Sequence, residues 1–590
     1  MIILFFYICF FIRSYLMKNL SILIFVLSIF VLISCSNEKK GPSANQEEVK
    51  KMEQQLQILI DNFVKEYQPV EAEANLAYWN AANYSNDSNW AKFSKYDMEM
   101  NKILSNPKVF AELKKIKESD LVQDSMLQQE MINLYDAMLG KQTDTTLLNE
   151  ISVLTSQIEQ KFSNFRAKYN GKELSDNDVE NVLKTSTNLA ELEGVWTEQK
   201  KIGPVVADDI LKLVKLRNKL AKSLGFNNFH EMSLTLSGQD PKEISALFDE
   251  LDNLTSGTFV SLKKEMDSVL ANRLKIKPAD LMPWHYQNRF FQEAPKIYSV
   301  DLDKYYKNKD VVKLAEEYYQ GLNMPIDKIV AHSDLFERKN KNQHAFCIDI
   351  NRITKDIRVL CNIKPNEDWM GTMLHENGHA LYEEYLSDNL PWILKQPAHI
   401  FTTEAVALFF QRLSTNPQWM EDMKIIDAKD KEKITPVSAK ILRLKELVFS
   451  RWAQVMYRFE KALYENPDQD LNKLWWDLVE KYQMIKRPAN RNMPDWATKI
   501  HIATSPCYYH NYLLGELFAS QMYYYLADKV VGSPDAINLS FFGNTKVGDF
   551  FKDKIFSVGA KYQWNDMIQR ATGEKLTAKY FAKQFINSEK

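Results

Sequence analysis

Residues 375–379 read His-Glu-Asn-Gly-His and place two imidazoles four residues apart. On an α-helix, positions i and i+4 lie on one face, so His375 and His379 are predicted to reach the same metal ion. Glu376 follows the first histidine, rotated by about 100° around the helix axis. We expect its carboxylate to act as the general base on a metal-bound water. The competing interpretation is a surface histidine pair beside an ordinary glutamate.

A catalytic zinc ion takes three protein ligands and leaves one position open. One straight helix cannot wrap three ligands around an ion, so we expect the third ligand on another helix. The downstream candidates are Glu383, Glu384, Asp388, His399 and Glu404. Pro391 ends the first helix, and Thr402 or Thr403 is a suitable N-cap for the next, with Glu404 in its first turn. We therefore predict one Zn²⁺ per chain, bound by Glu404 and the two histidines. The alternative is that Glu404 is only a first-turn carboxylate favoured by the helix dipole.

The chain around this motif has a helical pattern nearly throughout. Only 17 Gly and 19 Pro occur in 590 residues, which favours long helices over many short strands. Apolar residues recur at three- and four-residue spacing over Lys50–Tyr67, Leu147–Lys168, Asp208–Ser223, Pro241–Leu270, Ala439–Tyr464 and Leu471–Tyr482. Two β-branched, alternating runs, His344–Ile350 and Asp356–Ile363, flank the turn-like Asn351–Lys355 and predict an antiparallel hairpin. The predicted fold is mostly α, with a small sheet just before residue 375.

Composition excludes two classes of protein. The net charge of −2 provides no electrostatic footprint for nucleic acid. Five cysteines in 590 residues are too few for a disulfide scaffold. With 45% apolar and 26% charged residues, the chain is typical of a globular protein with a large core.

The first 35 residues have the layout of a signal peptide. A charged start at Met17 precedes the apolar run Leu20–Ser34 and Cys35, which resembles a bacterial lipobox. The alternative, a transmembrane anchor, needs about 20 residues, and this run has 15. We predict that the true start is Met17 and that Cys35 is lipidated. Residues 36–48 would be a flexible tether, and 49–590 one domain. The protein would be an exported bacterial lipoprotein on the periplasmic face of the inner or outer membrane, bound by its lipid anchor only.

Most of residues 46–585 resembles the angiotensin-converting enzyme family of zinc dipeptidyl carboxypeptidases, most strongly between His344 and Gln521. The runs Leu-His-Glu-Asn-Gly-His-Ala at 374–380 and Thr-Thr-Glu-Ala at 402–405 are similar to those of bacterial members. The resemblance implies a large two-lobed helical domain with a deep central cleft, and the hairpin beside the zinc. It also implies release of C-terminal dipeptides from oligopeptide substrates.

The segments Lys-Ile-His-Ile at 499–502 and Tyr-Tyr-His-Asn-Tyr at 508–512 are similar to the most diagnostic part of the family. The resemblance assigns Lys499 and Tyr509, or alternatively Tyr508, to the substrate's C-terminal carboxylate. The family also uses a Gln near a Trp, and Gln287 after Trp284 is a weak candidate because the local spacing differs.

The same resemblance assigns His501 and Tyr512 to the oxyanion of the tetrahedral intermediate. Preorganised donors at such an oxyanion are worth about 3–4 kcal/mol each, and His and Tyr are both suitable. His344 and Ala345 resemble the family's edge strand, which pairs with the substrate backbone.

Three departures from the family are visible. Four residues after Glu404 the family often has an acid that orients a ligand histidine, and here that residue is Leu408. Gln343 stands where animal members have a hairpin cysteine. Cys347 and Cys361 lie symmetrically about residue 354, so they form a disulfide across the hairpin or remain two buried thiols.

The third departure concerns chloride, which arginines hold in animal members. The matching positions are Asn511 and Val479, which carry no charge. His510 and Lys481 are nearby in sequence and are alternative cations. We expect no chloride activation.

Two other functions compete with the dipeptidyl carboxypeptidase. One is a zinc oligo-endopeptidase with the same helical cleft, and the other is an inactive peptide-binding lipoprotein. The intact Glu376 argues against the inactive protein, because a pure binder needs no general base. The oligomeric state is not predicted.

Overall fold

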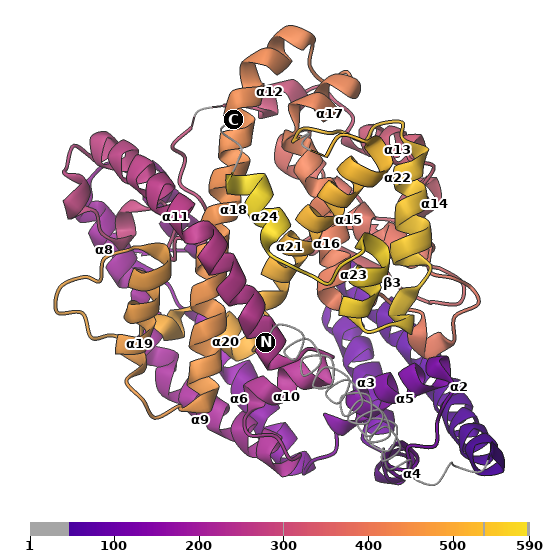
Figure 1. The fold of residues 1–590 in the computed structure, drawn as a ribbon. Coiled ribbons are helices and arrows are strands. Elements are labelled where there is room, and N and C mark those ends of the chain that lie inside the picture. Colours follow the sequence, from indigo (N-terminus) through magenta and orange to yellow (C-terminus); the bar gives the residue numbers. More distant parts are fainter. Residues whose placement is uncertain (1–45, 299, 535–536, 587–590) are drawn as a thin grey trace, which may run out of the picture.

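The computed structural model describes residues 46–298, 300–534 and 537–586, and within these ranges the chain is mostly helical, as predicted (Figure 1). The predicted signal peptide and Cys35 lie outside the described residues. Gln46, Glu47 and Glu48, the end of the predicted tether, instead begin the first described helix. The two glutamates in its first turn are favoured there by the helix dipole. Among the described residues, no helix combines the length and hydropathy needed to cross a membrane.

The long and short α-helices follow one another along the whole described chain. They are α2 (Gln46–Asn83), α3 (Asp87–Leu104), α4 (Pro107–Glu118), α5 (Ser125–Leu139), α6 (Thr145–Asn164), α7 (Asp176–Thr185), α8 (Leu189–Lys200), α9 (Ile202–Ser223), α10 (Phe229–Leu236), α11 (Pro241–Leu274), α12 (Asp303–Tyr306), α13 (Val311–Gly321), α14 (Asp327–His332), α15 (Glu367–Glu384), α16 (Ile400–Gln411), α17 (Pro417–Asp422), α18 (Ala428–Glu465), α19 (Leu471–Leu478), α20 (His501–Thr504), α21 (His510–Tyr525), α22 (Thr545–Phe550), α23 (Trp564–Thr572) and α24 (Lys579–Ile586).

Short 3₁₀ and π segments connect or extend these helices. The 3₁₀ segments are η1 (Pro278–Asp280), η2 (Pro283–His285), η3 (Trp392–Leu394), η4 (Arg412–Thr415), η6 (Asp495–Thr498) and η9 (Gly559–Lys561). The π segments are η5 (Val479–Gln483), η7 (Leu526–Val531) and η8 (Phe551–Phe556).

Two antiparallel hairpins are the only sheets among the described residues. The predicted hairpin is confirmed as β3 (Phe346–Asp349) and β4 (Ile357–Leu360). The other, β1 (Ala167–Tyr169) with β2 (Lys172–Leu174), begins where the sequence pattern predicted the end of a helix. Asn170 and Gly171 both have positive φ between these strands, and Asn-Gly is a strong hairpin signal.

Of the two alternatives left open for the β3–β4 hairpin, a disulfide or two thiols, the structure shows the thiols. Cys347 and Cys361 are both free thiols, and Cys347 lies opposite Val359. Phe346 pairs with Leu360, so the hairpin is centred on residue 353 rather than 354. That shift removes the two cysteines from directly opposite positions, which a disulfide across a strand pair requires.

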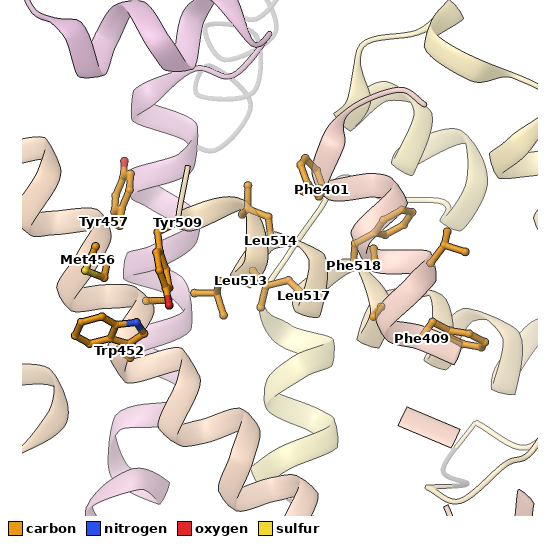
Figure 2. Packing of buried hydrophobic residues seen from close by; sticks show 14 of the residues in the cluster. Phe401, Phe409, Trp452, Met456, Tyr457, Tyr509, Leu513, Leu514, Leu517 and Phe518 are labelled. Carbon is orange, nitrogen blue, oxygen red and sulfur yellow. The ribbon is translucent and has the colours of Figure 1, made fainter. Parts of the chain in front are cut away.

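The helices form two groups, in agreement with the predicted two lobes. Figure 1 shows one group around α8, α9, α11 and α19 and another around α13 to α16, with α18, α21 and α24 between them. Figure 2 shows the apolar side chains of α21 between Trp452 and Tyr457 of α18 and Phe401 and Phe409 of α16. These side chains belong to one hydrophobic cluster, so α21 joins the two groups of helices through a continuous core. Burial of each large apolar side chain contributes about 1.5–3 kcal/mol to the free energy of folding.

α15 and α16 approach each other closely at Gly378, inside the His-Glu-Asn-Gly-His run. A Cβ on Gly378 would lie 2.9 Å from the Cα of Ala407 and 3.2 Å from its backbone nitrogen. Any larger residue would therefore push the helices apart. The glycine allows α16 to lie directly against the helix that carries the two histidines.

We predict that Gly378→Ala lowers both the melting temperature and the zinc affinity. Alanine in an open helix normally stabilises by about 0.5–1 kcal/mol relative to glycine, but overpacking here costs about 1–3 kcal/mol. The matched control is Gly257→Ala in α11, where an added Cβ meets nothing within 4 Å. Differential scanning calorimetry should show opposite signs for the two variants. An equal rise in both would mean that the contact does not constrain the helices.

Candidate metal centre

The three predicted ligands come together from two neighbouring helices. α15 begins after Asn366, whose side chain caps the backbone N–H of Trp369, and carries His375 and His379 on one face. Their Nε2 atoms are 3.2 Å apart, and an Oε2 atom of Glu404 lies 3.7 and 3.9 Å from them. All three ligand atoms lie within 4.8 Å of one another. Two imidazole nitrogens and one carboxylate oxygen are a donor set that suits Zn²⁺.

The start of α16 differs from the prediction. The N-cap residue is His399, not Thr402 or Thr403, because the imidazole Nδ1 accepts a hydrogen bond from the backbone N–H of Phe401. Thr402 completes the cap by bonding back to His399. Glu404 is consequently one turn further into the helix than the prediction placed it.

Each ligand imidazole is oriented by a neutral side chain of α16. Nδ1 of His375 lies 2.9 Å from Oε1 of Gln411, and Nδ1 of His379 lies 2.7 Å from the hydroxyl of Thr403. Burial lowers the pKa of His375 to about 4, so its imidazole is neutral and suited to metal binding. An acceptor on Nδ1 leaves Nε2 as the metal-facing nitrogen.

Gln411 orients the imidazole of His375, which the apolar side chain of Leu408 cannot do. The sequence analysis did not identify this residue. Gln411 lies seven residues after Glu404, so both occupy one face of α16. That i+7 spacing is the signal that would have identified it.

Glu376 is buried beside the β3 strand. The backbone N–H of Cys347 donates to its carboxylate, and β3 lies against α15. Burial first, and the neighbouring Glu404 second, raise the pKa of Glu376 to about 8. A divalent cation on the ligands would oppose the second effect, because it compensates the negative charge of Glu404.

Lys499 lies in an aromatic cage with a neutral partner. Its Nζ is 2.6 Å from Oε1 of Gln292 and 5.3 Å from the ring centre of Tyr509. Burial lowers the pKa of Lys499 to about 7. Gln287, the weak sequence candidate, instead accepts a hydrogen bond from the backbone N–H of Lys296. Gln292 was missed because the spacing from the tryptophan differs from the family pattern.

His501 and Tyr512 lie around Tyr509. Their rings are 5.3 and 5.4 Å from its ring, respectively. Nδ1 of His501 is buried and has no hydrogen-bond partner among the described residues. Burial and the charge of Glu404 raise the pKa of Tyr512, so its hydroxyl stays protonated. Burial and the charge of Glu404 also raise the pKa of Tyr508, whose ring is 5.3 Å from that of Tyr512.

The sequence candidates His344 and Ala345 precede β3 and are not among the residues that line the main cavity. His344 is exposed. The structure therefore brings the β3 backbone next to Glu376, but it does not bring these two residues into that cavity.

A cavity of about 940 Å³ extends from the metal ligands to the neighbours of Lys499. Its lining includes His375, Glu404 and Tyr512 and also Gln292 and Tyr509, which contact Lys499. Pockets of this size bind drug-sized ligands.

A mostly helical fold with these ligands on two adjacent helices defines a class of metallopeptidases. A family model described as angiotensin-converting enzyme matches residues 50–586, and the chain belongs to that family. Angiotensin-converting enzyme of Rattus norvegicus is 21% identical over 457 residues, which cover 72% of this chain and 34% of the relative. An inactive angiotensin-converting enzyme-related protein of Caenorhabditis elegans is 23% identical over 371 residues, 56% of this chain and 40% of the relative.

A shorter match joins the chain to a bacterial enzyme. Carboxypeptidase 1 of Bacillus subtilis is 23% identical over 275 residues, which cover 42% of this chain and 53% of the relative. The match to the two animal relatives spans only 34% to 40% of their length.

We predict that Gln411→Leu weakens zinc binding by about 10- to 100-fold, because the imidazole of His375 loses the acceptor that orients it. Gln411→Glu is the matched control, since its carboxylate keeps an acceptor at the same place. Competition with a chromophoric chelator measures both affinities. Wild-type affinity in Gln411→Leu would show that this hydrogen bond does not support the metal site.

Proposed function

We propose that the protein is a zinc-dependent peptidyl-dipeptidase that releases C-terminal dipeptides from oligopeptides. The observation that carries this proposal is one cavity lined by the metal ligands His375 and Glu404 and by Gln292 and Tyr509, the neighbours of Lys499. A cation at a fixed distance from a hydrolytic centre selects peptides by their terminal carboxylate.

The residues divide the reaction between them. His375, His379 and Glu404 would hold a Zn²⁺ ion, which would supply Lewis-acid polarisation of the scissile carbonyl and of water. Glu376 accepts the proton of the attacking water and delivers it to the leaving amine.

Two further pairs of residues stabilise the charges on the substrate. His501 and Tyr512 donate hydrogen bonds to the oxyanion of the tetrahedral intermediate. Lys499 and Tyr509 hold the terminal carboxylate, which sets the cleavage point two residues from the C-terminus.

Two alternatives remain outcomes of the same experiment. An oligo-endopeptidase would use the same ligands without the terminal carboxylate, and an inactive binder would keep the cavity without turnover. Mass spectrometry of products from a peptide library, with and without a chelator, separates the three. Dipeptides that disappear with chelator or with C-terminal amidation support the proposal. Internal fragments support the endopeptidase, and intact peptides support the binder.

We predict that Glu376→Gln keeps zinc but lowers kcat by several orders of magnitude, because the amide cannot accept the proton of water. Glu383→Gln is the matched control, since Glu383 is a half-buried acid on the same helix and lies outside the group of three metal ligands. Metal analysis and steady-state kinetics measure both variants. Unchanged turnover in zinc-loaded Glu376→Gln would contradict this mechanism.

We predict that Lys499→Ala raises KM for peptides with a free carboxylate by about 10-fold or more, because a charge-assisted contact is lost. Amidated peptides should change little. Kinetics on matched free and amidated peptides provide the test. An equal loss on both substrates would assign Lys499 a structural role.

We also propose that activity is independent of chloride. At the position of one family arginine, Asn511 accepts a hydrogen bond from Gln239 at 2.8 Å, and Gln239 also bonds His510 at 2.7 Å. Burial lowers the pKa of His510 far enough to keep it neutral. Val479 is buried and Lys481 is exposed, so neither supplies a buried positive charge.

The expected result is equal kcat/KM in chloride and in acetate at constant conductivity. A several-fold rise with chloride would contradict the proposal. In that case the candidate chloride ligand would be Lys200, a buried lysine that lines the same small cavity as Val479.

A further inference from the structure

The first turn of α21 carries Tyr512, the proposed oxyanion donor, and lacks a side-chain cap. Its N-cap residue is Tyr509, and no side-chain hydrogen bond closes the helix there. Tyr512 is half-buried at the wall of the main cavity, and its hydroxyl makes no hydrogen bond to another described residue. A tyrosine side chain has only two χ angles, so the position of this hydroxyl depends on the backbone of the first turn.

Gln239 bridges the two residues that precede Tyr512. Its Nε2 donates to Oδ1 of Asn511 at 2.8 Å, and its Oε1 lies 2.7 Å from Nε2 of His510. An amide oxygen only accepts, so the imidazole donates in the second contact. Gln239, His510 and Asn511 are buried, with exposed fractions of 2%, 2% and 4%. Water is excluded from these bonds, and one amide group therefore anchors the first turn of α21.

Gln239 is itself held in place by contacts outside α21. It lies between α10 and α11, where its backbone N–H donates to the carbonyl of Leu234 at 2.9 Å. The carbonyl of the preceding Gly238 accepts from Nε1 of Trp564 at 2.9 Å. We propose that Gln239 is a positioning residue that fixes the first turn of α21 and thereby directs the hydroxyl of Tyr512 at the oxyanion.

The other tyrosine beside this turn has supports that do not depend on Gln239. The ring of Tyr509 packs against Trp452 and Phe449 of α18, with ring centres 5.9 and 6.3 Å away. The proposed carboxylate clamp should therefore stay in place when the bonds of Gln239 are lost. An interaction made only in the transition state affects kcat, so replacement of Gln239 should change kcat more than KM.

Gln239→Met keeps the length of the side chain and removes both hydrogen bonds. This inference rests on the proposed function, and kcat should fall about 10-fold or more with KM within about twofold of wild type, because loss of one oxyanion donor costs about 100- to 1000-fold. The matched control is Gln521→Met, since Gln521 is a buried residue of the same helix whose Nε2 donates to Thr572. The control should lower the melting temperature but keep kcat within about twofold. An equal fall of kcat in both variants would overturn the proposal.

A double-mutant cycle with Tyr512→Phe separates positioning from a general structural role. If Gln239 acts through the hydroxyl of Tyr512, Gln239→Met should lower kcat no further once that hydroxyl is absent. Independent effects would multiply instead and would overturn the proposal. Asn511→Ala removes only one of the two bonds, so it provides the same cycle with a smaller disturbance if Gln239→Met folds poorly.

A binding measurement distinguishes failure of this inference from failure of the peptidase proposal. A phosphinic peptide carries the tetrahedral, negatively charged centre of the intermediate, and its binding by the zinc-loaded protein needs no turnover. Calorimetry should show about 10-fold weaker binding of this peptide to Gln239→Met and unchanged binding of alanyl-alanine. A wild type that binds the phosphinic peptide but cleaves nothing would reject only the peptidase proposal. Equal affinity of wild type and variant would reject the role of Gln239, and no binding by the wild type would reject both.

Discussion

The contact between α15 and α16 at Gly378 and Ala407 is the constraint on which the metal centre depends. His375 and His379 lie on one helix and Glu404 on the other, so the ligand separation is set by how closely the backbones approach. Protein interiors are packed densely enough that one additional methyl group is felt. The glycine between the two histidines thus has a physical role that is separate from the chemistry of its neighbours.

The other functional residues are positioned by elements that pack on α15 and α16. α21 packs on α16 and α18, which brings Tyr512 and Tyr509 to the same cavity as Glu404. The β3 strand packs on the other side of α15 and places a backbone N–H on Glu376. The catalytic groups are therefore carried mainly by packed helices. Such elements hold a geometry more tightly than loops do.

Several parts of this arrangement could be predicted from the sequence because they depend on local patterns. The 3.6-residue period identified the long helices, and alternation identified the β3–β4 hairpin. The proposed ligand Glu404 followed from counting zinc ligands and from the break at Pro391. The resemblance pointed to Lys499 and Tyr509.

Other parts depend on contacts between distant segments, which one sequence does not reveal. The histidine cap of α16 and the acceptor role of Gln411 arise only when α15 and α16 are packed together. Gln292 meets Lys499 across 207 positions of sequence. The centre of the hairpin lies one residue from the position that symmetry of the two cysteines implies, so each cross-strand partner is shifted by two residues and Cys347 faces Val359 instead of Cys361.

The most direct test of the three-ligand zinc site is anomalous diffraction at the zinc edge from crystals of the zinc-loaded protein. We expect one strong peak per chain, within bonding distance of Nε2 of His375, Nε2 of His379 and a carboxylate oxygen of Glu404. The Nδ1 atoms should remain hydrogen-bonded to Gln411 and Thr403. A peak at other residues, or zinc on the two histidines without Glu404, would contradict it.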